Sequence, residues 1–137
     1  PTNLRWTFSY PISLLFVFCR NTVFNLSIHD LVEQQRLVWT SPEDDTKMCV
    51  VKGKDEEACQ NYIRIMVVPS PGRLFVCGTN SFRPMCNTYI ISDSNYTLEA
   101  TKNGQAMCPY DPRHNSTSVL AGKCTLCSNT GGLLKLL

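Results

Sequence analysis

The chain has 137 residues and a formal net charge of +2, from 13 Lys and Arg against 11 Asp and Glu. This length is enough for one domain at most, or for part of one. The charge is too small, and the lysines and arginines are too scattered, to predict binding to nucleic acid or to an anionic membrane.

The N-terminal segment contains an apolar run at residues 12–18, which follows Arg5. The run has the length of a signal-peptide core, but no small-x-small cleavage motif precedes Arg20. A signal peptide therefore remains an alternative. The run is also far too short to span a bilayer, and no transmembrane segment is predicted elsewhere in the chain.

Alternation of apolar and polar residues at positions 22–28 predicts the first β-strand of the main region. On this pattern Phe24 and Leu26 face inward, while Asn25 faces outward. The next residues, 29–35, are compatible with one turn of helix.

Four further strands, consecutive and antiparallel, predict one blade of a β-propeller. A Pro-Ser-Pro-Gly turn separates the first two, and an Asn-Gly turn precedes the last. The predicted strands are residues 62–68, 73–79, 85–92 and 105–108. The predicted fold class is therefore all-β.

Two pairs of cysteines have spacings that favour disulfide bonds. Cys77 and Cys86 lie on neighbouring strands of a hairpin that turns at residues 78–84, close enough to bridge. Cys49 and Cys59 flank a polar loop, and a bond between them would close about 11 residues, which is worth roughly 2–3 kcal/mol. The alternative is four metal thiolates, but zinc ribbons place the members of each pair only two to four residues apart. Disulfides in turn favour a secreted domain.

The cysteines outside these pairs do not predict a catalytic or metal site. Cys108 is expected to be a small buried hydrophobe, because neither histidine occupies a recognisable base position. Cys124-x-x-Cys127 has the spacing of half a zinc site or of a redox pair, but the further ligands and the βαβ context are missing. We therefore expect no catalytic residue, no metal, no cofactor and no small-molecule substrate.

Three Asn-x-Ser/Thr triplets begin at Asn25, Asn95 and Asn115. All three fall in predicted turns or on an outward strand face, which fits a secreted glycoprotein. The triplets predict N-linked glycosylation at these three positions.

Several motifs give the chain a specific family resemblance. They are RNTVFNLS at residues 20–27, CQNYIR at residues 59–64, LFVCGTNSFRPMC at residues 74–86 and CPYDP at residues 108–112. In this order and spacing they resemble the start of a semaphorin sema domain, of the invertebrate transmembrane type.

The resemblance implies part of a seven-bladed β-propeller, comprising about the first blade and the N-terminal strand. It covers residues 20–121, so residues 1–19 and 122–137 are expected to lie outside the family domain. Both flanks are compatible with intron read-through, because their codons can contain a splice acceptor and a splice donor. A genuine short isoform with its own termini is the alternative. With about one blade present, the strand at residues 22–28 is expected to lack the last blade that it joins in a complete ring.

For function, the resemblance implies an extracellular or cell-surface guidance ligand that binds plexin receptors and forms a homodimer at full length. The main receptor-contacting surfaces of the family lie on later blades, so no receptor-binding residue is assigned to this chain. The alternatives are a fragment of a sema-domain receptor of the plexin type, or a small cysteine-rich redox or zinc protein. An enzyme is not expected.

Overall fold

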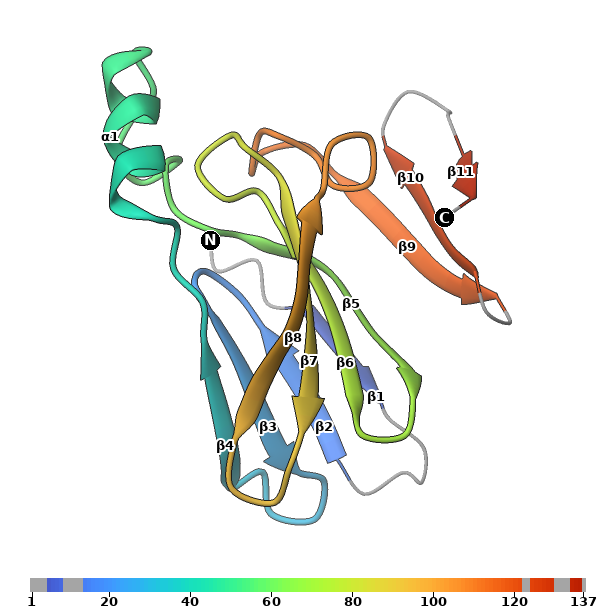
Figure 1. The fold of residues 1–137 in the computed structure, drawn as a ribbon. Coiled ribbons are helices and arrows are strands. Elements are labelled where there is room, and N and C mark those ends of the chain that lie inside the picture. Colours follow the sequence, from blue (N-terminus) through green and yellow to red (C-terminus); the bar gives the residue numbers. More distant parts are fainter. Residues whose placement is uncertain (1–4, 9–13, 122–123, 130–133, 137) are drawn as a thin grey trace.

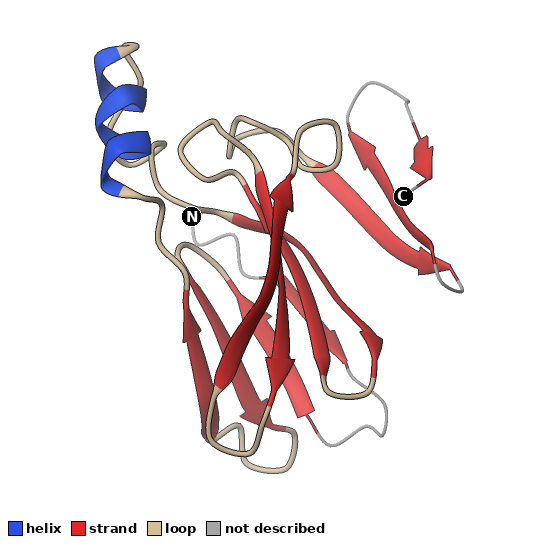
Figure 2. Ribbon diagram, in the orientation of Figure 1, coloured by secondary structure: helices blue, strands red, loops and turns tan. Residues whose placement is uncertain are grey.

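The computed structural model describes residues 5–8, 14–121, 124–129 and 134–136. Across these ranges the chain forms three antiparallel sheets and one helix (Figures 1 and 2). The first sheet has the order β1-β2-β3-β4, with bounds Arg5–Phe8, Leu14–Phe18, Thr22–Ser27 and Glu33–Val38. The second has the order β5-β6-β7-β8, with bounds Ile63–Ser70, Arg73–Gly78, Met85–Ile91 and Tyr96–Asn103. The third has the order β11-β10-β9, with bounds Leu134–Leu136, Cys124–Asn129 and Ser116–Ala121.

Neighbouring strands within each sheet are also consecutive in sequence, so each sheet is a meander. Several of the connections between strands contain residues with positive φ, and in two of them the residue type suits that conformation. Asn21, between β2 and β3, has φ 61°, and Gly72, between β5 and β6, has φ 74°. Asparagine and glycine tolerate this left-handed conformation better than other residues do. The all-β class predicted from the sequence is confirmed.

The first and second sheets pack against each other through one buried hydrophobic cluster. Phe16 of β2 is 0% exposed and Leu74 of β6 is 0% exposed, and both belong to it. Each fully buried side chain of this size contributes roughly 1.5–3 kcal/mol. The buried members of the cluster are Phe16, Phe18, Val23, Leu37, Ile63, Met66, Leu74, Val76, Tyr89 and Tyr96.

The opposite face of the second sheet carries a second cluster, which includes Phe75 and Cys77 of β6. Leu74 and Val76 point to the first cluster, so alternate residues of β6 line opposite faces. Both faces of β6 are therefore covered within the described chain. β9, which belongs to the third sheet, contacts β5, the edge strand of the second sheet (Figure 1).

The predicted orientation of the strand at residues 22–28 is wrong. Val23 is 0% exposed and Asn25 is 3% exposed, and both face the second sheet, whereas Phe24 and Leu26 are only half-buried. Phe24 packs on the outer face of the first sheet, with the Arg36 guanidinium 5.0 Å from its ring centroid. The periodicity of two was right, but apolar residues occur on both faces of this strand and the pattern could not choose between them.

The expectation that this strand lacks a partner blade is also overturned. β3 is the third strand of a four-stranded sheet and pairs with β2 on one side and β4 on the other. β2 comes from the segment that was expected to lie outside the family domain. Its Phe16 and Phe18 alternate toward the core, which gives β3 an apolar neighbour.

Two smaller predictions, for residues 29–35 and residues 105–108, are also wrong. Residues 29–35 form a turn and the start of β4, because Asp30 accepts the Val32 N–H at 3.2 Å and the chain then pairs with β3. The fourth strand of the blade is β8, not residues 105–108. The latter form a turn, in which the Met107 and Cys108 amides donate to Gly104 O at 3.0 and 2.9 Å.

Candidate functional site

The helix α1 (Glu43–Val51), which connects the first two sheets, is fixed at both ends by local chemistry. Pro42 occupies the N-cap and three acidic residues fill the first turn, where they complement the helix dipole. At the C-terminus Gly53 has φ 86°, and its N–H donates to Val50 O at 2.9 Å while the Lys54 N–H donates to Cys49 O at 3.3 Å. This is the Schellman motif that ends many helices. α1 was not among the elements predicted from the sequence, although proline before it and glycine after it were the available signal.

Two disulfide bonds attach the loops at this end of the molecule. Cys49 of α1 is bonded to Cys59, with a Cα–Cα distance of 5.9 Å. Cys77 of β6 is bonded to Cys86 of β7, its direct cross-strand partner, with a Cα–Cα distance of 4.1 Å. The structure thus pairs the four cysteines in the way that their spacing predicted. Together the bonds hold α1 and the β6–β7 loop close to the second sheet.

The β6–β7 loop contains three consecutive residues with positive φ, none of them glycine. They are Asn80 at 43°, Ser81 at 57° and Phe82 at 61°. Each left-handed residue costs roughly 1–2 kcal/mol relative to an ordinary conformation, so the surrounding structure must enforce the turn. Ser81 Oγ donates to Cys59 O at 2.6 Å, and the Arg83 N–H donates to Thr79 O at 3.0 Å.

A buried asparagine connects this loop to the first sheet. Asn61 is 0% exposed, and its Nδ2 donates to Trp39 O at 3.0 Å while its Oδ1 accepts the Asn80 N–H at 3.0 Å. Its own N–H donates to Asn21 Oδ1 at 2.9 Å. A Cβ atom on Gly78 would lie 2.1 Å from Asn61 Oδ1, so this approach requires glycine. No local sequence pattern predicted this role for Asn61 or Gly78.

Asp45 extends the same network into α1. Its Oδ2 accepts Asn80 Nδ2 at 3.0 Å and its Oδ1 accepts Arg83 Nη1 at 2.9 Å. The Asp45 side chain is 16% exposed, so this pairing is partly shielded from water. One carboxylate therefore fixes both the helix and the strained turn.

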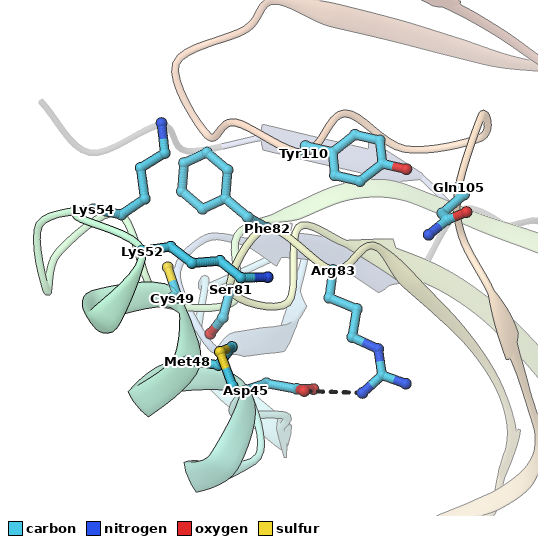
Figure 3. A pocket seen from close by; sticks show the side chains of 10 residues that line it. All are labelled: Asp45, Met48, Cys49, Lys52, Lys54, Ser81, Phe82, Arg83, Gln105 and Tyr110. Carbon is cyan, nitrogen blue, oxygen red and sulfur yellow. Dashed lines mark hydrogen bonds and ion pairs between the residues drawn. The ribbon is translucent and has the colours of Figure 1, made fainter.

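Between these elements lies a cavity of about 340 Å³. Figure 3 shows α1 on one side of it, the β6–β7 loop in the middle, and Gln105 and Tyr110 on the other side. Its lining residues are Asp45, Met48, Cys49, Lys52, Lys54, Ser81, Phe82, Arg83, Gln105 and Tyr110. Three cations and one carboxylate line it, so its net charge is positive. Lys54 Nζ lies 4.7 Å from the centroid of the Phe82 ring, a cation–π contact.

The titratable groups with shifted pKa values lie elsewhere and have structural causes. Burial between the sheets raises the pKa of Tyr89 and of Tyr96 above the ordinary 10.0, with the Asn87 amide that donates to Tyr89 acting in the opposite direction. Burial, and then the Glu57 hydrogen bond, raise the pKa of Tyr62. All three phenols are therefore neutral at ordinary pH.

The three predicted glycosylation positions differ in accessibility. Asn25 is 3% exposed and faces the second sheet, so a glycan on its Nδ2 would have to pass between two packed sheets. The structure argues against a glycan at this position. Asn95, in the turn between β7 and β8, and Asn115, before β9, are both exposed.

The remaining cysteines fall in three places. Cys19 is half-buried between β2 and β3. Cys108 is 1% exposed within the second cluster, as expected of a small buried hydrophobe. Cys124 and Cys127 belong to β10, and their side chains lie outside the described part of the structure. Among the described residues no three His, Cys, Asp or Glu side chains gather as metal ligands do, and no helix is long and apolar enough to cross a bilayer.

Comparison with known proteins shows which family this chain belongs to. No model of a known protein family matches the chain. The chain is, however, 94% identical over 107 residues to Semaphorin-1A of Drosophila melanogaster, across 78% of this chain and 12% of that protein. The chain belongs to the semaphorin family. It is also 44% identical over 116 residues to Semaphorin-5B of Mus musculus, across 85% of this chain and 10% of that protein.

Solved structures agree with this assignment. Drosophila Semaphorin 1a, extracellular domains 1-2, matches with a TM-score of 0.81 and 76% identity, across 92% of this chain and 24% of that one. A structure of Drosophila Plexin A in complex with Semaphorin 1b matches with a TM-score of 0.80 and 31% identity, again across 92% and 24%. The predicted fold class, part of a sema-domain β-propeller, is confirmed. The described part is larger than predicted, with two complete four-stranded sheets and the strands β9–β11.

Proposed function

We propose that the complete protein containing this chain is an extracellular semaphorin ligand, not an enzyme, which binds plexin receptors and guides axons and migrating cells. The observation that carries this proposal is the 94% identity to Semaphorin-1A over 107 residues. The similarity to the structure described as Plexin A in complex with Semaphorin 1b supports the choice of receptor. The chain spans 12% of the length of the Drosophila relative, so activity belongs to the whole protein.

The mechanism is recognition by a rigid surface. Packed sheets, two disulfide bonds and a buried asparagine network hold the loops in fixed positions, so little conformational entropy is lost when a partner binds. Dimerisation of the full-length ligand would bring two receptors together. The family identity supports a signalling ligand rather than an enzyme.

Within the chain, we assign residues 20–121 to the sema domain and residues 1–19 and 122–137 to flanking segments. The match to Semaphorin-1A has 94% identity and covers 78% of this chain. The match to the Drosophila Semaphorin 1a structure covers 92% of this chain, and its identity is lower, 76%. The lower identity over the longer match supports flanks that diverge from the relatives. The first flank is nonetheless part of the packed unit, since β2 contributes Phe16 and Phe18 to the core.

The extracellular location is supported by the oxidised cysteine pairs and by the exposed Asn95 and Asn115 triplets. We propose glycans at these two positions and none at Asn25. Expression through an insect secretory pathway, followed by peptide mass spectrometry with and without glycosidase, tests this. Occupied Asn25, or unoccupied Asn95 and Asn115, would contradict it.

The receptor proposal is tested by surface plasmon resonance on an immobilised plexin ectodomain. The full-length protein is expected to bind, whereas the 137-residue chain is expected to bind weakly, because the main contact surfaces lie on later blades. A full-length protein that is correctly folded and disulfide-bonded but does not bind any plexin would refute the proposal. Binding to semaphorins instead of plexins would favour the receptor alternative.

A further inference from the structure

We propose that the cavity beside α1 is a docking site for a short acidic peptide segment of a protein partner. A carboxylate of the segment pairs with Lys52 or Lys54, and a neighbouring apolar side chain packs on Phe82 and Tyr110. The proposal does not rest on plexin binding and concerns a separate surface.

The charge of the cavity is the first argument. Of its three cations, Arg83 is already engaged by Asp45 at 2.9 Å. Within the described residues, Lys52 and Lys54, which follow the C-terminus of α1, have no ion pair. In contrast, Lys47 within α1 pairs with Glu43 at 2.6 Å. Two uncompensated ammonium groups at one cavity attract an anion.

The apolar wall is the second argument. Met48 is 54% exposed and Tyr110 is 45% exposed, and both line the cavity together with the half-buried Phe82. Large apolar side chains exposed around a concave site are typical of an interaction surface. The ligand must therefore combine a negative charge with apolar area, as a carboxylate next to a Leu or Phe side chain does.

The rigidity of the cavity is the third argument. Phe82 and Arg83 are presented by a left-handed turn that Asp45, Asn61 and Cys59 hold through hydrogen bonds. Strained turns that the surrounding structure enforces in this way cluster at ligand-binding positions. The volume, about 340 Å³, is at the lower end of the range for ligand pockets and suits a few side chains.

A sulfated polysaccharide fits the site less well than a peptide does. Such a chain carries closely repeated charges and needs an extended row of cations. Beyond the cavity, nearby basic side chains are compensated, for example Arg113 by Asp55 at 2.7 Å and Arg20 by Glu57 at 2.6 Å. The wall also includes Met48, Phe82 and Tyr110, whose apolar side chains gain nothing from contact with sulfate groups.

The test is a titration of the isotopically labelled full chain, followed by two-dimensional NMR. The probe is the peptide Phe-Asp-Glu-Leu-Glu with blocked ends, and its matched control is Phe-Asn-Gln-Leu-Gln. We expect the acidic peptide to shift the amide signals of Lys52, Lys54 and Phe82 and the control peptide to leave them unchanged. The double variant Lys52→Ala with Lys54→Ala should weaken binding about tenfold.

Matched variants decide whether the effect belongs to the cavity. Lys47→Ala removes the same charge from α1 outside the cavity and should change the affinity less than about twofold. Tyr110→Ala removes apolar surface from the cavity wall, leaves the charge of the cavity unchanged, and should weaken peptide binding severalfold. Equal binding of the two peptides, equal weakening by Lys47→Ala, or no cavity shifts at millimolar peptide would each overturn the proposal. So would a heparin tetrasaccharide that shifts the same signals at lower concentration than the peptide.

Discussion

The first and second sheets share one hydrophobic cluster, but each sheet is stabilised by a different set of interactions. The first sheet, β1–β4, contributes Phe16, Phe18, Val23 and Leu37 to the core and contains neither of the two disulfide bonds. The second sheet, β5–β8, contains the Cys77–Cys86 bond and is linked to α1 through the Asn61 and Asp45 network. Its two faces are covered by two separate clusters.

The difference determines where the chain can accept a change of sequence. A sheet held by apolar packing accepts any strand that places large apolar side chains at alternate positions, and β2 meets that requirement. A loop held by directed hydrogen bonds and disulfides accepts only particular residues, such as Gly78 and Asn61. Substitutions in the two regions should therefore affect stability in different ways.

The largest effect is expected from the core of the first sheet. Phe16→Ala should lower the free energy of unfolding by about 3–5 kcal/mol, because the side chain is fully buried and leaves a cavity. Phe24→Ala is the matched control on the outer face of the same sheet and should cost about 1 kcal/mol or less. Urea unfolding followed by fluorescence measures both. Equal costs would show that the first sheet is not packed on the second through β2.

The next effect concerns the asparagine network. Asn61→Ala should cost about 2–4 kcal/mol, since it leaves the buried Asn80 N–H and Trp39 O without their partner. Asn103→Ala, at an exposed position where the side chain accepts only the Gln105 N–H, is the control and should cost about 1 kcal/mol or less. A small loss in both variants would mean that water replaces the Asn61 contacts.

Removal of the Cys49–Cys59 bond should have a somewhat smaller effect. The double variant Cys49→Ala with Cys59→Ala is expected to lose about 2–3 kcal/mol, because the bond closes a short loop of the unfolded chain. Hydrogen exchange should rise in α1 and stay unchanged in β3, which lies in the other sheet. Faster exchange throughout β3 would contradict this difference between the two regions.

The smallest effect is on the pH dependence of stability. Burial raises the pKa of Tyr89 and Tyr96, so above pH 10.0 the unfolded chain binds fewer protons than the folded chain does. The contribution of these two tyrosines to the free energy of unfolding is therefore fully present below their ordinary pKa and is lost as the pH rises past it. Urea unfolding at about pH 8 and about pH 11 should show this decline, and Tyr89→Phe should reduce it. An unchanged decline in the variant would assign it to other groups.

Local patterns predicted much of the second sheet. The Pro-Gly turn and the run from Arg73 to Gly78 located β6, and the hairpin spacing of Cys77 and Cys86 predicted their proximity. These features depend on neighbours in sequence, so they are readable without the fold. β8 was missed because it is an edge strand in which only Tyr96 is buried, which leaves no alternating signal.

The site could be predicted only in part. The cysteine pairs that frame it follow from spacing, but the cavity brings together residues from α1, the β6–β7 loop and the loop before β9. In the sequence, Lys52 and Lys54 cannot be distinguished from ordinary solvated charges. Only in the structure does a strained turn place Phe82 beside Lys54. No local pattern predicts three consecutive left-handed residues, because contacts distant in sequence enforce them.

The amino-acid sequence was enough to predict the all-β class, the family, the positions of the four strands β3, β5, β6 and β7, and the pairing of cysteines across a hairpin. Each of these depends on alternation, turn chemistry or motifs within a few residues. Tertiary structure alone decided which face of β3 is buried, that β2 completes the first sheet, and that Asn25 is inaccessible while Asn95 is exposed. The physical reason is that a strand with apolar residues on both faces has no preferred side until another sheet packs against one of them.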